Sequence, residues 1–167
     1  MLAPSARPDW RYRVPLAESL RIADQLGRAI AGPAWQGPSL LEAIDDVTAA
    51  QAATKPMAGA HSIHELVAHA TAWIDIARQR LEGTPPPVTD AMDWPAVSAG
   101  DWAAARTHLE AAARRLESLI RSLDDGRLPE EIPIEGDRWS VYETLHGVIQ
   151  HALYHAGQIA ILKKGLS

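Results

Sequence analysis

Hydrophobic positions recur three and four residues apart along four long stretches of the chain, and Pro- or Gly-rich stretches separate them. This spacing places the apolar side chains on one face of an α-helix, because the helix turns once in about 3.6 residues. Strand-like alternation is weak, and its best example is the segment 130–136, for which we expect one short extended piece. The pattern therefore predicts an all-α protein.

The four stretches define four amphipathic helices. Capping-box pairs indicate where two of them begin, with Ser62 followed by Glu65 and Ser140 followed by Glu143. A third such pair, Ser39 and Glu42, indicates a short extra helix before the second long one. The expected long helices are Pro15–Ala31, Ser62–Leu81, Trp102–Leu123 and Ser140–Lys164.

The connection between the second and third helices, Glu82 to Gly100, is Pro-rich and much longer than a tight helix hairpin needs. A connection of this length can cross the bundle and leave the helices on either side of it parallel. We therefore expect a four-helix bundle with one long crossover, and a single domain over residues 1–167.

Composition narrows the function. The net charge is −5 and acids interleave with the basic residues, so no positive field is available for nucleic acid. The chain has no cysteine, which excludes thiolate ligands and a cysteine nucleophile. No run of about 18 apolar residues and no signal-peptide pattern occurs, so we expect no membrane span and a cytoplasmic location.

Three of the seven histidines are expected to point into the bundle. His151 and His155 are four residues apart, about 40° in helical phase, on the buried stripe of the last helix. His69 lies between Leu66 and Trp73 on the buried side of the second helix. By the same criterion His64 and His146 belong off the inner face, on the surface or at the rim of the bundle.

A lone core histidine usually makes one hydrogen bond and has no further role, but three buried imidazoles without partners cost several kcal/mol, on the order of one per ring or more. A shared divalent ion would use one nitrogen from each. The protease motif H-E-x-x-H is absent, because Ala152 follows His151. A di-iron bundle needs two E-x-x-H motifs, and Glu143 with His146 is the one candidate. A single ion held by His69, His151 and His155 is the interpretation that remains.

Other residues near this cluster have open roles. Gln158 is placed to bond a ligand or substrate, or else to pack against a neighbouring helix, and Tyr154 is a candidate for lining the pocket. Trp73 is the tryptophan expected beside the site. Gly147 and Gly157 each cost their helix about 1 kcal/mol relative to Ala, which indicates tight packing or space for a ligand, and we expect tight packing.

Three segments of the chain resemble the DinB-like, or YfiT-like, superfamily of metal-dependent helical-bundle proteins. They are "WQGPSLLEAI" over Trp35–Ile44, "GAHSIHELVAHATAW" over Gly59–Trp73, and "WSVYETLHGVIQHALYHAGQIAILKK" over Trp139–Lys164. The similarity spans most of residues 15–165, although the first helix and the Glu82–Gly100 connection match only in pattern.

The resemblance implies an up-down-down-up four-helix bundle, frequently a homodimer, with His69, His151 and His155 holding one divalent ion, often nickel or zinc. Relatives of this kind include thiol-dependent S-transferases that use low-molecular-weight thiols and a mycothiol-dependent maleylpyruvate isomerase. The family name comes from damage-inducible expression and does not imply DNA binding.

These observations give two hypotheses. In the first, the protein is a metal-dependent S-transferase or hydrolase acting on a small molecule, and any thiol arrives as a cosubstrate because the chain has none. An ion held by three neutral imidazoles would acidify a bound water or thiol at neutral pH. In the second, the protein is a non-catalytic, metal-binding or stress-related dimeric bundle. The sequence identifies neither the substrate nor a catalytic residue.

Overall fold

The computed structural model describes residues 16–134 and 137–166. Most of them are helical, so the prediction of an all-α protein is confirmed. The four long helices are α1 (Glu18–Ala31), α4 (Ile63–Leu81), α6 (Trp102–Arg121) and α7 (Val141–Lys164). Their bounds lie within three residues of those expected, and Pro15, the expected start of the first helix, lies outside the described residues.

Short elements join the long helices. The predicted extra helix is α2 (Leu40–Ala43), and the expected extended piece pairs with the chain after it as an antiparallel hairpin of β1 (Glu131–Ile134) and β2 (Asp137–Ser140). Two short helices were not predicted, α3 (Ala49–Ala53) and α5 (Asp90–Asp93). Single 3₁₀ turns, Ala99–Asp101 and Asp125–Arg127, lie before and after α6.

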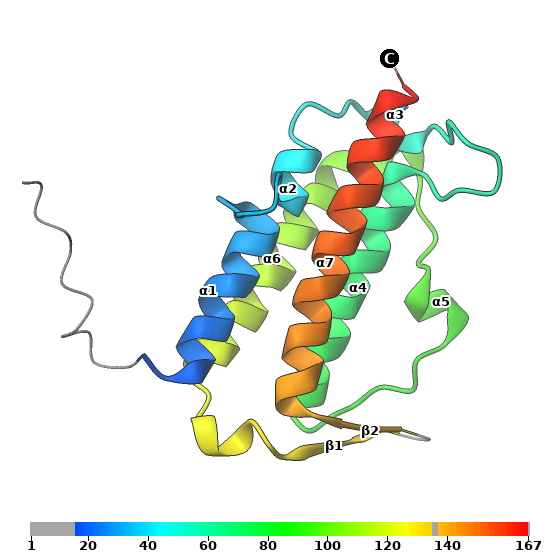
Figure 1. Cartoon of the computed structure of the whole chain (residues 1–167). Helices are drawn as coiled ribbons and strands as arrows, with labels where there is room; N and C mark the ends of the chain where they lie inside the picture. Colours follow the sequence, from blue (N-terminus) through cyan, green and yellow to red (C-terminus); the bar gives the residue numbers. More distant parts are fainter. Residues whose placement is uncertain (1–15, 135–136, 167) are drawn as a thin grey trace, which may run out of the picture.

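The long helices lie side by side, with α6 packed on α1 and α4, and α7 packed on α4 and α1 (Figure 1). Figure 1 shows α1 and α7 running toward the end of the bundle where the chain finishes, and α4 and α6 running the other way. The connection that contains α5 passes along the outside of α4. This route lets α4 and α6, which follow one another in the chain, run parallel.

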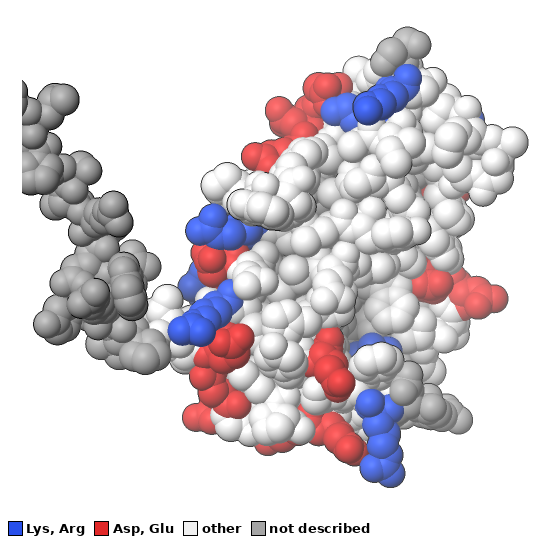
Figure 2. Space-filling model, in the orientation of Figure 1, with Lys and Arg blue, Asp and Glu red and all other residues white. Residues whose placement is uncertain are grey.

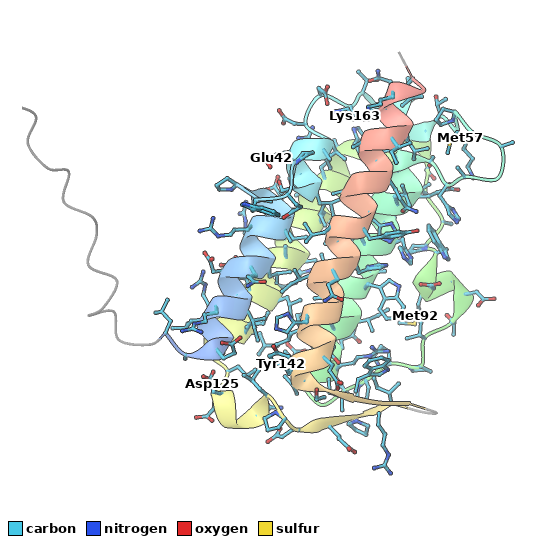
Figure 3. The ribbon with its side chains drawn as sticks, viewed as in Figure 1. Glu42, Met57, Met92, Asp125, Tyr142 and Lys163 are labelled. Atoms are coloured by element: carbon cyan, nitrogen blue, oxygen red, sulfur yellow. The ribbon has the colours of Figure 1, made fainter. Side chains whose placement is uncertain are left out.

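The helix starts follow the capping rules. Ser62 and Ser140 each accept from the backbone N–H three residues on, and Glu65 and Glu143 bond back to the cap residue, so both predicted capping boxes are present. Helix α1 lacks a side-chain cap of its own, and Asp125, in the 3₁₀ turn that follows α6, takes its place (Figure 3). Its carboxylate accepts from the N–H of Glu18 at 2.7 Å and of Ser19 at 2.9 Å.

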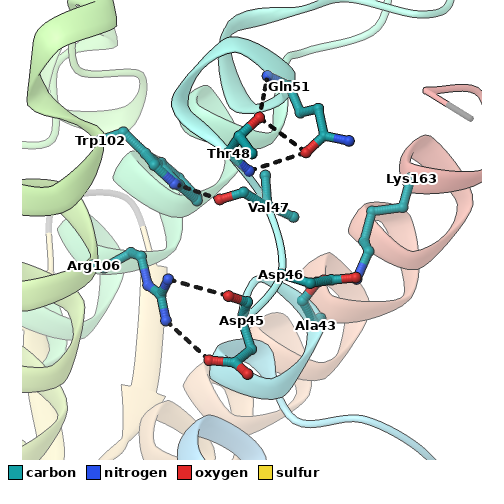
Figure 4. A network of polar contacts seen from close by, with 9 residues as sticks. All are labelled: Ala43, Asp45, Asp46, Val47, Thr48, Gln51, Trp102, Arg106 and Lys163. Carbon is teal, nitrogen blue, oxygen red and sulfur yellow. Dashed lines mark hydrogen bonds and ion pairs between the residues drawn. The ribbon is translucent and has the colours of Figure 1, made fainter.

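Polar contacts fix the segment with α2 and α3 across the other end of the bundle (Figure 4). The indole of Trp102 donates to the carbonyl of Val47 at 2.9 Å. Lys163 of α7 donates to the carbonyl of Ala43 at 3.1 Å and pairs with Asp46. These bonds tie the segment to both α6 and α7, so the short helices close the end of the core.

The core is one continuous cluster of aliphatic side chains between the long helices. The expected stripe of α7 is buried throughout, and Leu109 and Leu116 of α6 are completely buried. Charged side chains gather at the margins of the face in Figure 2, and the α7 side of the bundle shows few of them. None of the helices in the described part of the chain has both the length and the apolar character that crossing a membrane requires.

Candidate metal centre

The three predicted histidines meet between α4 and α7. His69 Nε2 lies 2.9 Å from His151 Nε2, and His155 Nε2 lies 2.8 Å from the same atom. The three ligand atoms all lie within 4.8 Å of one another. His69 and His155 are 6% and 4% exposed, and His151 is partly exposed. The helical phases of the sequence therefore placed all three correctly.

The crossover connection orients His69. Its Nδ1 donates to the backbone carbonyl of Asp93, the last residue of α5, at 2.6 Å. The Asp93 carboxylate lies 3.3 Å from the same nitrogen and accepts from the indole of Trp73 at 2.6 Å. Trp94 stacks on the His69 ring with centroids 3.9 Å apart and planes 8° apart. The Asp93 carbonyl therefore fixes the position of the proton on His69, and Trp94 fixes the plane of the ring. Both residues lie outside α4.

His155 is oriented by a residue of its own helix. Its Nδ1 donates to Gln158 Oε1 at 2.6 Å, one turn further along α7. In this contact Gln158 supports the imidazole of a predicted ligand, a role that the sequence did not predict. Supports of this kind fix the tautomer and the direction of a metal-ligating ring.

A count of protons shows what the cluster can accept. Because both supporting groups are carbonyl oxygens, the neutral rings of His69 and His155 carry their proton on Nδ1 and present a lone pair at Nε2. Both lone pairs point at His151 Nε2, which can donate one proton at most. In one of the two short contacts, two nitrogen lone pairs would therefore face each other with no proton between them. A cation shared by all three nitrogens removes this conflict, so the donor set fits a divalent ion.

The electrostatics also favour neutral imidazoles. The pKa of His151 is lowered to about 4, mainly by burial and then by the neighbouring His155 and His69, while Asp93 opposes them. Burial likewise lowers the pKa of His155, against the raising effect of its bond to Gln158. Neutral imidazole is the form that binds metal, so these two rings need not lose a proton at neutral pH to bind an ion.

An open cleft of about 600 Å³ begins at His69 and His151 and continues between α4 and α7 toward the hairpin. Trp73 lines it, as the sequence predicted for the tryptophan beside the site. Three histidine ligands leave an ion at least one coordination position, and catalytic zinc sites have this arrangement whereas structural sites have four protein ligands. The cleft gives a small molecule a route to that position.

Tyr154 was expected to line the pocket, but it is not among the described residues that line the cleft. Its side chain is 63% exposed. It lies beside His155, with ring centroids 5.2 Å apart, on the outer side of α7. It directly precedes His155 in the helix, and the single step of about 100° turns it away from the inner face.

The two helix glycines also differ from expectation. A Cβ added at Gly147 or at Gly157 would meet no atom within 4 Å, so tight packing explains neither. Gly147 lines the cleft and Gly157 does not. Space for a ligand is therefore the interpretation that fits Gly147.

The prediction that His64 lies at the surface or rim is wrong. His64 is 3% exposed, and its ring lies edge-on to Trp102 of α6, 5.5 Å away between centroids. Helix α4 is buried on two sides, against α7 and against α6, so a residue that faces away from the three histidines still enters the core. His146 is half-buried, next to Tyr142.

The sequence pattern predicts no role for Asp93 and Trp94, which lie in the connection expected only to cross the bundle. The usable signal is its length, because long connections in compact domains are usually functional. An acid followed by an aromatic residue in "DAMDWP" is a further signal in that stretch. Neither signal says which helix the two residues contact.

Comparison with known proteins agrees with the geometry. The sequence profile of the DinB superfamily matches residues 35–159, which include all three histidines and both of the short helices that the pattern did not predict. The chain therefore belongs to the DinB superfamily. No curated protein and no solved structure gives a significant match.

Proposed function

We propose that this protein is a divalent-metal-dependent enzyme, a thiol-dependent S-transferase or a hydrolase, that acts on a small molecule. The observation that carries the proposal is the convergence of three imidazole nitrogens of which two present lone pairs. Membership of the DinB superfamily supports the same centre, and the directions of the long helices support the family's up-down-down-up bundle.

In this proposal His69, His151 and His155 hold the ion, and nickel or zinc suits an all-imidazole set. When bound, the ion supplies a Lewis acid that lowers the pKa of a coordinated water or thiol. Asp93 and Gln158 hold the Nδ1 protons of two ligands, and Trp94 covers one ligand ring. The chain's own residues thus prepare the nitrogens and exclude water from one side of the centre.

The cleft favours a catalytic over a non-catalytic role. A protein that only stores or senses an ion has no need of a 600 Å³ opening that reaches two of the three ligands. Because the chain has no cysteine, a thiol reaction requires a low-molecular-weight thiol as cosubstrate, whereas hydrolysis requires only water. Both reactions require that the three histidines hold the ion.

The decisive measurement is elemental analysis of the purified protein. We expect about one divalent ion per chain in the wild type and almost none in His155→Ala, with His146→Ala as the matched control on the same helix. An ion content that is the same in wild type and His155→Ala contradicts the site.

Activity is then measured on the metal-loaded protein. A low-molecular-weight thiol with 1-chloro-2,4-dinitrobenzene tests thiol transfer, and 4-nitrophenyl acetate tests hydrolysis. We expect turnover of one of them in wild type and its loss in His155→Ala. A bound ion without turnover of either reagent would favour the non-catalytic, metal-binding alternative.

A homodimer is also a proposal. The exposed apolar side chains Tyr154 and Ile161 lie on α7, seven residues apart and therefore on one face, and they are 63% and 61% exposed. Between Glu143 and Lys163, α7 carries no Asp, Glu, Lys or Arg. Size-exclusion chromatography with light scattering tests it, and Tyr154→Glu should shift a dimer to a monomer.

A further inference from the structure

The cleft beside the three histidines follows a single face of α4. His69, Trp73, Ala77 and Arg80 line it, at intervals of four, four and three residues. At about 1.5 Å of rise per residue, the eleven steps from His69 to Arg80 span roughly 16 Å. The cleft is therefore elongated, with the histidines at one end and the β1–β2 hairpin at the other.

Its walls are apolar and aromatic along most of this length. Trp73 and Ala77 on α4 face Val148 on α7, and Ile134 and Trp139 of the hairpin form the far wall. Between them lies Gly147, where even a Cβ would meet no atom within 4 Å. An apolar body can therefore lie along the middle of the cleft, and a planar ring suits a wall made of indole.

The end remote from the histidines is polar and rich in donors. Thr144 Oγ1 is buried and has no hydrogen-bond partner within the described part of the chain, and Thr144 lines the cleft. Arg80 is the only positively charged side chain among the described residues of the lining, and its guanidinium lies 5.4 Å from the centre of the Trp73 ring. A guanidinium donates hydrogen bonds and never accepts them.

Each acid of the lining already accepts hydrogen bonds from the protein. Glu143 accepts from the Ser140 N–H at 2.9 Å and from its hydroxyl at 2.7 Å, and these bonds hold the pKa of Glu143 below its usual value. Asp93 accepts from the Trp73 indole at the other end of the cleft. The guanidinium of Arg80 can only donate, and the hydroxyl of Thr144 can donate or accept, so an oxygen acceptor on the ligand suits both groups, whereas a group that only donates suits the hydroxyl alone.

We propose that the cleft is the substrate site and that it takes an elongated molecule with a planar ring and an oxygen hydrogen-bond acceptor at its far end. The ring lies against Trp73 over Gly147, and the acceptor is bonded by Thr144 Oγ1 next to Arg80. The opposite end of the molecule lies at His69 and His151. The interpretation of the cleft as a substrate site rests on the proposed function, but binding of the molecule to the cleft does not require the ion.

The test is isothermal titration calorimetry with three probes that share a phenyl ring and a four-carbon chain. We expect 4-phenylbutanoate and 4-phenylbutanamide to bind the wild type, and 4-phenylbutylammonium, which offers only donors, to bind at least about tenfold more weakly. Equal or tighter binding of the ammonium overturns the assignment of the far end, and no binding of any probe overturns the site.

Gly147→Leu and Gly157→Leu form a matched pair on α7. Both positions are open, so neither side chain meets protein at its Cβ, but only Gly147 lines the cleft. We expect Gly147→Leu to abolish probe binding and Gly157→Leu to leave it unchanged. Equal affinities of the two variants for 4-phenylbutanoate contradict the location.

Thr144→Val separates binding from folding. It removes a buried hydroxyl that has no described partner, so it should leave the thermal midpoint unchanged or raise it. Binding of 4-phenylbutanoate should nevertheless weaken about tenfold. An unchanged affinity overturns the role of Thr144.

The titrations are made on metal-free and on zinc-loaded protein. Probe binding without zinc binding would retain the cleft and reject the metal centre, and zinc binding without probe binding would do the reverse. The two proposals therefore fail separately.

Discussion

His155 and His69 are held by different kinds of support. Gln158, which orients His155, lies three residues away on the same helix, so the correct folding of α7 brings the two together. The carbonyl that orients His69 belongs to Asp93, 24 residues further along the chain in the crossover connection. One half of the centre is therefore built by helical repeat alone, and the other half depends on the path of a loop.

The largest expected effect comes from removing a ligand of either half. His69→Ala and His155→Ala should each lower zinc affinity at least a hundredfold, because two imidazoles cannot replace three. Competition titrations with a chelator measure this loss. His146→Ala, a half-buried histidine of α7 that faces elsewhere, serves as control and should retain wild-type affinity.

The loop-borne support should come next. Trp94→Ala removes the ring that stacks on His69 and loosens the chain next to the Asp93 carbonyl, so we expect zinc affinity to fall by about 10- to 100-fold. The same titration measures it. Trp35→Ala, at a tryptophan that is 99% exposed, should have no effect, and a comparable loss there would contradict a specific role for Trp94.

A smaller effect is expected from the helix-borne support. Gln158→Leu removes the acceptor for His155 Nδ1, and zinc affinity should fall about tenfold, whereas Gln158→Glu keeps an acceptor and should retain it. Gln150→Leu is the matched control on the exposed side of α7. If Gln158→Leu proves more damaging than Trp94→Ala, the loop is not the more important support.

The smallest effect concerns pH in the metal-free protein. The pKa of His151 is about 4 in the folded chain against an ordinary value of 6.5, so between these values the unfolded chain binds more protons. The free energy of unfolding should therefore fall as the pH is lowered from about 6.5 to about 4. Urea titrations in the presence of a chelator measure this slope, and His151→Gln should make it shallower.

The sequence predicted the part of the centre that lies on helices, but it did not predict the part that lies in the loop. Capping boxes and the spacing of apolar residues located α4 and α7, and helical phase then turned His69, His151 and His155 inward. Phase failed for His64, because it identifies one buried face and α4 has two. The number of neighbours that a helix has is set by tertiary packing and not by its own residues.

The contacts of Asp93 and Trp94 could not have been predicted in the same way. A loop has no repeat that converts residue number into direction, so where it lies depends on side chains far away in the sequence. The stacking of Trp94 on His69 and the bond from Trp73 to Asp93 are contacts of this kind. Gly147 is a similar case, because a helix glycine indicates either close packing or empty space, and the neighbouring elements determine which.

The indole of Trp94 lies in face-to-face contact with the His69 ring, and the indole of Trp73 is bonded to the residue that orients it. Two natural fluorophores are therefore in place at the centre without any label. A paramagnetic ion such as nickel, held by the three imidazoles, should quench their emission, whereas zinc, which has a filled d shell, should leave most of it. Occupancy can thus be followed optically, in real time, on the unmodified chain.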